Sequence, residues 1–405
     1  METAYQKNFS EAERERELRK KRVEGEKRGD DFLDEDGVKN CERFKIEGYL
    51  ELKGKEGRKA IAELSKIIKS GNQSFHLENI ILSDKMKRDI GNTHAIINEV
   101  YQTFLSHENI TQIIPQYDLE QLQNKGSSSL INVIYRLVAK YILEIFGTEK
   151  NGKIYLDDKR GDFFELVNKL ISNGLEKYLD VYKTDIPLYE IMYQALEKDL
   201  QSGKHQSEIY LGRDAVFMFQ GRRAELISKL RQMKPAERKR IKQEIERKGG
   251  IVFYPQYITI PSNFVPGRGY FGVKPRNLKS YLQQSNIDKE IDPVFVDVGC
   301  RGTIPEYIMH LLGYSVKEMK EKIHLLVTGY DDYRVDGVPK GVDLLSLEHR
   351  PKKEERAMGL TRDSDGQIKH FALPTHPVEQ FEYELCSQAV KRHFWDKAKM
   401  KRFKV

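Results

Sequence analysis

Apolar residues recur at helical spacing through much of the first half of the chain. The clearest stretch runs from Ser129 to Phe146, where apolar side chains form one wide face and Gly147 ends the pattern. Three further stretches show the same spacing, at 57–70, 162–179 and 187–200. We therefore predict a mainly helical domain over residues 41–202.

The pattern changes after Gly203, where short apolar runs alternate with longer helical periods. The runs cover 208–211, 251–260, 294–296 and 323–327, and the helical periods cover 215–230, 277–284 and 304–312. Alternation of this kind is typical of βα units that build a parallel sheet. We predict that residues 203–405 form an α/β domain with a Rossmann-like, mostly parallel sheet.

The ends of the chain and its composition limit the classes of protein to consider. Residues 1–40 are mostly charged, and we expect either a disordered arm or an exposed helix there. No apolar run reaches the roughly 18 residues that a membrane span needs, and the N-terminus lacks the apolar stretch of a secretory signal. The three cysteines, Cys41, Cys300 and Cys386, are too scattered for a disulfide framework. These features predict a cytoplasmic protein.

Basic residues account for the formal charge of +7 and gather in clusters, including 234–250 and 391–405. A solvated helix face is the simplest interpretation of each cluster. The alternative is a nucleic-acid or protein partner, although no nucleic-acid-binding motif accompanies the charge.

The strongest candidate for chemistry is the turn at 297–303, within PVFVDVGCRGTIPEY. A buried strand is expected to end at Asp297 and a helix to begin near Thr303. Gly299 and Gly302 allow a tight turn, and a helix N-terminus beside Arg301 favours an anion such as phosphate. Asp297 would then contact sugar hydroxyls or a metal ion. The alternative is an ordinary βα turn in which Asp297 accepts hydrogen bonds from backbone amides.

Other polar residues follow the remaining predicted strands, where ligands of parallel sheets bind. They are Arg213 and Asp214 after the first strand, Arg268 and Lys274 in the loop after the second, and Asp331 and Asp332 after the fourth. An ion pair between Arg213 and Asp214 is an equally open alternative to a ligand contact. Surface connections and solvated carboxylates would account for the other four residues. Cys300 is adjacent to Arg301, which leaves no room for the loop of a cysteine phosphatase, so we expect a packing cysteine.

The segment VFVDVGCRGTIPEYI resembles the phosphoribosyl-diphosphate-binding loop of type I phosphoribosyltransferase-like proteins. This resemblance implies that Asp297 contacts the ribose hydroxyls and that Mg²⁺ accompanies the diphosphate. The 5′-phosphate would be held by Gly299, Arg301, Gly302 and Thr303. The segment IYLGRDA is similar to the strand and loop that contact the pyrophosphate, which assigns that role to Arg213 and Asp214. The turn differs from the family in having one acidic residue in place of two.

A second resemblance, to degenerate haloacid-dehalogenase-like domains, rests on Gly-Arg-Asp after the first strand and on the later Val-Asp-Val-Gly. It implies a nucleophilic Asp214, but Val216 stands where the acid that protonates the leaving group is expected. Three functions remain open. They are a phosphoribosyltransferase-like enzyme or enzyme-derived domain that binds a phosphorylated ribose or nucleotide, a non-catalytic interaction or effector protein, and a phosphatase of the second family.

Overall fold

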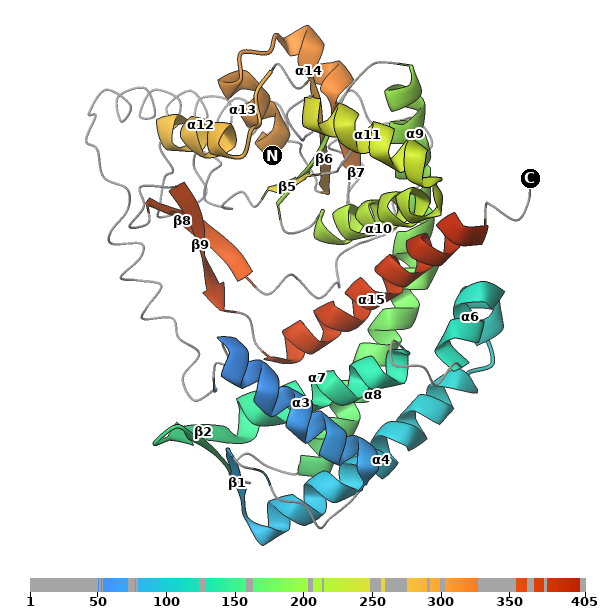
Figure 1. Cartoon of the computed structure of the whole chain (residues 1–405), viewed down its shortest axis with the longest axis vertical. Helices are drawn as coiled ribbons and strands as arrows, with labels where there is room; N and C mark the ends of the chain where they lie inside the picture. Colours follow the sequence, from blue (N-terminus) through green and yellow to red (C-terminus); the bar gives the residue numbers. More distant parts are fainter. Residues whose placement is uncertain are drawn as a thin grey trace, which may run out of the picture.

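The computed structural model describes much of the chain from Leu50 onward. The described segments are residues 50, 52, 54–71, 77, 79–123, 129–157, 163–202, 207–212, 215–247, 256–258, 275–289, 292–298, 303–326, 355–362, 368–374 and 377–400. These residues are mostly helical, and their strands form three small sheets (Figure 1).

A helical body forms from the first part of the described chain. Its helices are α3 (Gly54–Ser70), α4 (Asp84–Leu105), α5 (Ile110–Ile113), α6 (Gln116–Gln123), α7 (Leu130–Phe146), α8 (Phe163–Asp180) and α9 (Ile186–Gln201). The helices predicted from apolar spacing, α3, α7, α8 and α9, are confirmed. Their apolar faces share one core, which includes Leu64, Ile134 and Leu196.

Helices α8 and α9 form one continuous rod, although the sequence pattern predicts two separate helices. A π-helical turn, η1 (Val181–Asp185), joins them, and its flanking residues Asp180 and Ile186 keep helical backbone angles. Pro187 follows at the second position of α9 and lacks the N–H that a regular helix would need there. The wider π turn is a known way to carry a helix past such a defect.

A three-stranded sheet lies at the edge of the helical body, in the order β1 (Ile80–Leu82), β3 (Lys153–Leu156), β2 (Gly147–Lys150). Strand β2 starts directly where α7 ends. A two-residue turn of Asn151 and Gly152, with φ of 54° and 71°, connects β2 to β3. Asn-Gly is the preferred pair for such hairpin turns because both positions require positive φ.

The rest of the chain supplies a four-stranded sheet, a two-stranded sheet and the remaining helices. In chain order these elements are β4 (Ser207–Leu211), α10 (Val216–Gln232), α11 (Pro235–Arg247), β5 (Gln256–Ile258), α12 (Pro275–Gln284), β6 (Pro293–Val298), α13 (Thr303–Leu311), α14 (Val316–Lys322), β7 (Ile323–Leu326), β8 (Glu355–Arg362), β9 (Ile368–Pro374) and α15 (Pro377–Met400). The four strands pair in parallel in the order β5-β4-β6-β7, and β8 pairs with β9 in antiparallel fashion.

The predicted fold class, with a Rossmann-like sheet as the architecture of residues 203–405, is wrong. The described chain is mostly helical, and even its largest sheet has strands of only three to six residues. After β7 the described chain adds an antiparallel hairpin instead of another βα unit, and then the long helix α15. Short apolar runs identified where strands occur, but they carry no information on how far a sheet extends.

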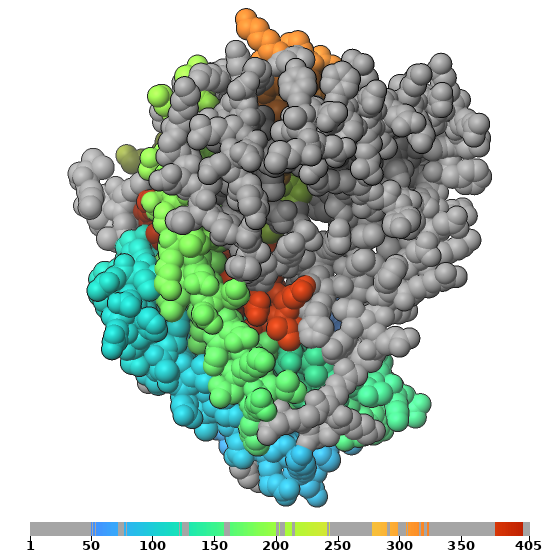
Figure 2. Space-filling model, turned by 180° about the vertical axis from the view of Figure 1, so that it is seen from behind, coloured from blue at the N-terminus to red at the C-terminus, as the bar shows by residue number. Residues whose placement is uncertain are grey.

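Helix α15 turns back onto the helical body instead of covering the sheet. It packs against α6, α7, α8 and η1, and most extensively against α10 (Figure 1). From the opposite side, Figure 2 shows a red part of α15 beside the green band of α8 and α9. The proposed domain boundary between residues 202 and 203 stays a prediction. Residues of α15 belong to the same hydrophobic core as the helices before that boundary.

Alternate residues of the central strands face two different cores. Tyr210 of β4 and Val296 of β6 join the large core of the helical body. Ile209 and Phe295, their neighbours along the strands, join a smaller core made with α12, α13 and α14. This is the period of two that places successive strand residues on opposite faces. The sheet is therefore covered on both faces.

Two glycines allow α15 to approach its neighbours closely. A Cβ added at Gly221 of α10 would lie 2.6 Å from Phe394 and 2.8 Å from Val390 of α15. A Cβ added at Gly174 of α8 would lie 2.7 Å from both Phe381 and Leu385. These separations are shorter than carbon atoms tolerate, so both positions require glycine for the observed packing.

Replacing Gly221 with alanine is expected to destabilise the protein, against the trend of helix propensity. Alanine in a helix favours folding by about 0.5–1 kcal/mol relative to glycine, whereas overpacking a core typically costs about 1–3 kcal/mol. We expect a net loss of about 1–2 kcal/mol in urea unfolding. Lys239→Ala, at an exposed position of α11, should change stability by less than about 0.5 kcal/mol. A Gly221→Ala variant as stable as the wild type would contradict this account of the packing.

Candidate functional site

The carboxyl ends of β4 and β6 form the first candidate site. The two strands are parallel neighbours, so both end at the same edge of the sheet. From β4 the chain continues to β5 on one side, whereas from β6 it continues to β7 on the other. Two neighbouring parallel strands whose connections lead to opposite sides of the sheet create a switch point. Ligands of open parallel sheets bind in the crevice outside such a point.

Asp297 lies at this edge of the sheet. Tyr210 pairs with Val296, and Leu211 and Asp297 come next on their two strands. The Asp297 residue is 7% exposed, and its Oδ1 accepts a hydrogen bond of 2.8 Å from the backbone N–H of Val298. This backbone contact is the one expected for an ordinary turn, and it also fixes the carboxylate at the strand end.

Described residues that flank the two loops also lie near this edge of the sheet. Gly212 follows β4 with φ of 64°, a conformation that favours glycine. Helix α13 begins at Thr303, where the sequence predicts a helix N-terminus. The structure therefore brings the start of the Arg213–Asp214 loop next to the strand that carries Asp297.

Most of the other predicted site residues lie outside the described part of the chain. They are Arg213, Asp214, Gly299, Arg301, Gly302, Arg268, Lys274, Asp331 and Asp332. Their roles stay predictions. Val216 is described, and it is buried in the large core at the first position of α10. No acid stands at that position to support the phosphatase chemistry.

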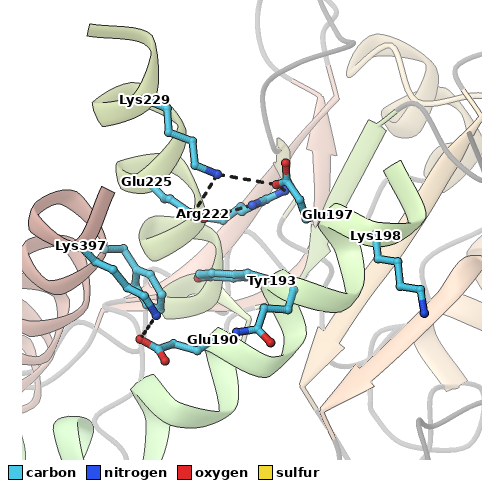
Figure 3. A pocket seen from close by; sticks show the side chains of 10 residues that line it. Glu190, Tyr193, Glu197, Lys198, Arg222, Glu225, Lys229 and Lys397 are labelled. Carbon is cyan, nitrogen blue, oxygen red and sulfur yellow. Dashed lines mark hydrogen bonds and ion pairs between the residues drawn. The ribbon is translucent and has the colours of Figure 1, made fainter. Parts of the chain in front are cut away.

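A second candidate site, absent from the sequence predictions, is a charged pocket between α9, α10 and α15 (Figure 3). Arg222 of α10 forms its floor and is only 1% exposed. The guanidinium contacts three carboxylates, at 2.8 Å from Glu208 and at 3.1 Å from each of Glu197 and Glu225. It also lies over the ring of Tyr193.

The charges around Arg222 stabilise one another. Burial lowers the pKa of Arg222, but the charge and hydrogen bonds of Glu208 outweigh it, so this pKa is raised well above the ordinary value. Burial raises the pKa of Glu225, but Lys229 and Arg222 outweigh it and the pKa is lowered. Arg222 and Glu225 therefore remain charged at neutral pH. Removing one member of such a buried group leaves uncompensated charge, which typically costs about 3–5 kcal/mol.

The sequence pattern does not predict this cluster, because a charged residue in a helix is usually solvated. Arg223 next to Arg222 is indeed exposed. One local signal distinguishes the two arginines: Arg222 lies four residues after Met218, which is buried, and so falls on the same helix face. The decisive partner, Glu208, is on a strand and has no regular spacing from Arg222.

The two basic clusters also differ in how far their side chains are exposed to solvent. Residues 234–240, at the start of α11, are exposed, as expected for a solvated face. In α15, by contrast, His393 is buried and Lys391 and Lys397 are half-buried, whereas Lys399 is exposed, so only part of the described cluster is a solvated face. The first ten residues of the 391–405 cluster lie within α15.

His393 joins three helices beside the charged pocket. Its Nδ1 lies 3.0 Å from Asp118 of α6, and its Nε2 lies 2.8 Å from Glu190 of α9. Burial lowers the pKa of His393, but the hydrogen bonds and charges of Asp118 and Glu190 outweigh it, so the pKa is raised. Burial raises the pKa of Glu190, but His393 and Lys397 outweigh it and lower the pKa to about 2.

None of the helices within the described segments combines the length and apolar character that a membrane span requires. In the same part of the chain, no three or more His, Cys, Asp or Glu side chains are grouped so that they could hold a metal ion. Asp331 and Asp332, two of the predicted site residues, lie outside that part of the chain.

Replacing His393 with glutamine should reduce stability most at low pH. A histidine with a raised folded-state pKa contributes its full stabilisation below the unfolded value of about 6.5 and loses it as pH rises through the folded value. At pH 6 we expect a deficit of about 1.5–3 kcal/mol in urea unfolding, because hydrogen bonds to charged groups are lost. The deficit should narrow towards pH 9. A difference between wild type and variant that is independent of pH would contradict the charged state of His393.

A comparison of the chain with models of protein families finds no match, and a comparison with curated protein sequences finds none either. No family therefore transfers a function to the two sites. Their function has to be inferred from the chain's own residues and geometry.

Proposed function

We propose that the chain binds a phosphorylated ribose or a nucleotide at the carboxyl ends of β4 and β6, and that it acts as a phosphoribosyltransferase-like enzyme. The observation that carries this proposal is the parallel pairing of these two strands at a switch point. It supports a common site for two loops that are far apart in the sequence, IYLGRDA and VDVGCRGT.

The residues at the strand ends suit a sugar phosphate. The helix that begins at Thr303 directs its N-terminal partial positive charge towards the preceding turn, which favours a phosphate. Asp297, at the end of β6, is the described carboxylate that would contact ribose hydroxyls. Arg213 and Arg301 would supply positive charge to the phosphate groups, by the resemblance of their loops.

Transfer at the anomeric carbon requires placed charge more than a nucleophile. The diphosphate leaving group and the cation-like sugar carbon both develop charge in the transition state, and fixed groups stabilise it without reorganisation. Arg213 would contact the leaving diphosphate, while Asp297 would hold the ribose in place. Mg²⁺ would enter with the diphosphate and neutralise part of its charge.

Isothermal titration with phosphoribosyl diphosphate, ribose 5-phosphate and common nucleotides, each with Mg²⁺, tests this function. We expect at least one of these ligands to bind the wild type. Asp297→Asn keeps an oxygen for the Val298 N–H but removes the charge, and Thr303→Ala removes a hydroxyl at the start of α13. Each change should weaken binding by at least about tenfold, which corresponds to about 1.4 kcal/mol.

Asp292→Asn is the matched control, because Asp292 directly precedes β6 and so lies at the other end of the same strand. Its ion pair with Lys322 makes a small change in stability acceptable, but ligand affinity should not change. Absence of heat with every ligand, or equal affinity in all three variants, would contradict the proposal. Those outcomes would leave the sheet as a scaffold for protein interactions.

A further inference from the structure

The end of α10, the start of α11 and the last turns of α15 meet at one corner of the molecule (Figure 1). Arg231, in the last turn of α10, lies over the ring of Trp395 of α15, with its Cζ 4.9 Å from the ring centroid. Arg238 of α11 donates hydrogen bonds of 2.9 to 3.2 Å to the backbone carbonyls of Leu230, Arg231 and Met233. These contacts fix both α11 and Trp395 relative to the end of α10.

The chain at this corner carries a concentrated positive charge. Residues 231–240 hold five cations and one carboxylate, Glu237. The cations, all exposed, are Arg231, Lys234, Arg238, Lys239 and Arg240. Within the part of the chain that the structure describes, none of the five forms an ion pair. Exposed lysines elsewhere differ, because Lys183 lies 3.8 Å from Asp180 and Lys399 lies 2.9 Å from Asp396. The charge of residues 231–240 is therefore available to an anionic partner.

An aromatic ring beside these cations favours one class of partner. A nucleic acid carries a phosphate at every nucleotide, which a series of lysines and arginines can neutralise. The bases of a single strand also stack on aromatic rings and on the planar guanidinium group of arginine. Arg231 is exposed and Trp395 is half-buried, so both groups of this stacked pair are open to solvent.

An anionic membrane would also match the charge, but it fits the surface less well. A helix that binds in a membrane interface inserts large apolar side chains between the lipids. Among the described residues, the exposed large apolar side chains are Ile81 of β1 and Ile191 of α9. Neither belongs to α10, α11 or α15.

We propose that this surface binds single-stranded nucleic acid. We call it the basic corner and define it by Arg231, Lys234, Lys239, Arg240 and Trp395. The three cations after Arg231 contact phosphates, and a base stacks against Arg231 and Trp395. Because phosphates and the faces of bases are common to all sequences, the basic corner binds with little sequence preference.

The basic corner is separate from the crevice at the strand ends. Helix α10 begins at Val216, shortly after β4 ends at Leu211, and Arg231 lies fifteen residues further along the helix. At 1.5 Å per residue, roughly 20 Å of helix separates the two places. A strand bound at the basic corner therefore does not require Asp297, and failure of either proposal leaves the other intact.

Fluorescence anisotropy with labelled twelve-nucleotide oligouridine and oligodeoxythymidine tests the proposal. At least one of these single strands should bind the wild type, and its Kd should rise about tenfold or more between 50 and 200 mM NaCl, as expected for about three phosphate contacts. Binding should also quench the fluorescence of Trp395, the single tryptophan. The matching duplex, with its bases stacked internally, and inorganic polyphosphate, with no bases, should leave this fluorescence unchanged.

Two double charge reversals locate the bound strand. Lys239→Glu with Arg240→Glu should weaken binding by at least about tenfold. Lys55→Glu with Arg58→Glu, at exposed positions of α3, makes the same change in net charge and should weaken binding by less than about twofold. The Tm and the far-UV spectrum show whether each variant is folded.

Asp297→Asn distinguishes the basic corner from the crevice, and this variant should bind the oligonucleotide as the wild type does. The proposal is overturned if neither single strand binds or if binding leaves Trp395 fluorescence unchanged. It is also overturned if the two folded double variants lose affinity equally, since binding would then follow net charge alone. Loss of binding in Asp297→Asn would place the strand in the crevice and overturn it as well.

Discussion

The close approach of helix α15 to α8 and α10 is the constraint on which the rest of the structure depends. Gly174 and Gly221 leave no side chain between these helices, so the rings of Phe381 and Phe394 occupy the space instead. The contact is apolar along much of α15, whose buried residues include Leu385 and Val390. It joins the last described helix of the chain to the helices formed earlier, including α10, which directly follows β4.

The position of α15 also determines which charged groups His393 and Lys397 contact. Because α15 lies between α6, α9 and α10, His393 reaches Asp118 and Glu190, and Lys397 reaches Glu190 at the pocket. Polar groups on α15 reinforce the contact with α10, since Ser387 donates to Gln220 and the backbone carbonyl of Trp395 accepts from Ser228. The apolar contact brings these groups together, and their charges then specify which partners meet.

Local patterns in the sequence predicted most of the helices and strands that were tested, because each of these elements depends on residues that are close together along the chain. The apolar face of α7 and the apolar run of β6 are examples. The extent of the sheet could not be predicted, since it depends on pairing between distant segments. Arg222 and His393 were missed for the same reason. Glu208, the buried partner of Arg222 on β4, is 14 residues away, and the partners of His393 are 275 and 203 residues away.

The candidate site at the strand ends shows the same limit. The strand that ends near Asp297 was predicted from its apolar residues, and the structure confirms the strand. Whether the strand with the IYLGRDA loop lies beside it could not be derived from either segment alone. Parallel pairing of β4 with β6 supplies that relation, and it makes a shared site for the two loops a reasonable hypothesis.

The central claim, that α15 is an integral part of the core, has a direct test because Trp395 of α15 is the single tryptophan of the chain. Its ring lies beside Arg231 of α10, so its fluorescence reports on the contact between the two helices. Urea unfolding followed by Trp395 fluorescence and by far-UV circular dichroism should give coincident transitions, as expected for one cooperative unit. A fluorescence transition at clearly lower urea concentration would show that α15 detaches first, and would contradict the account.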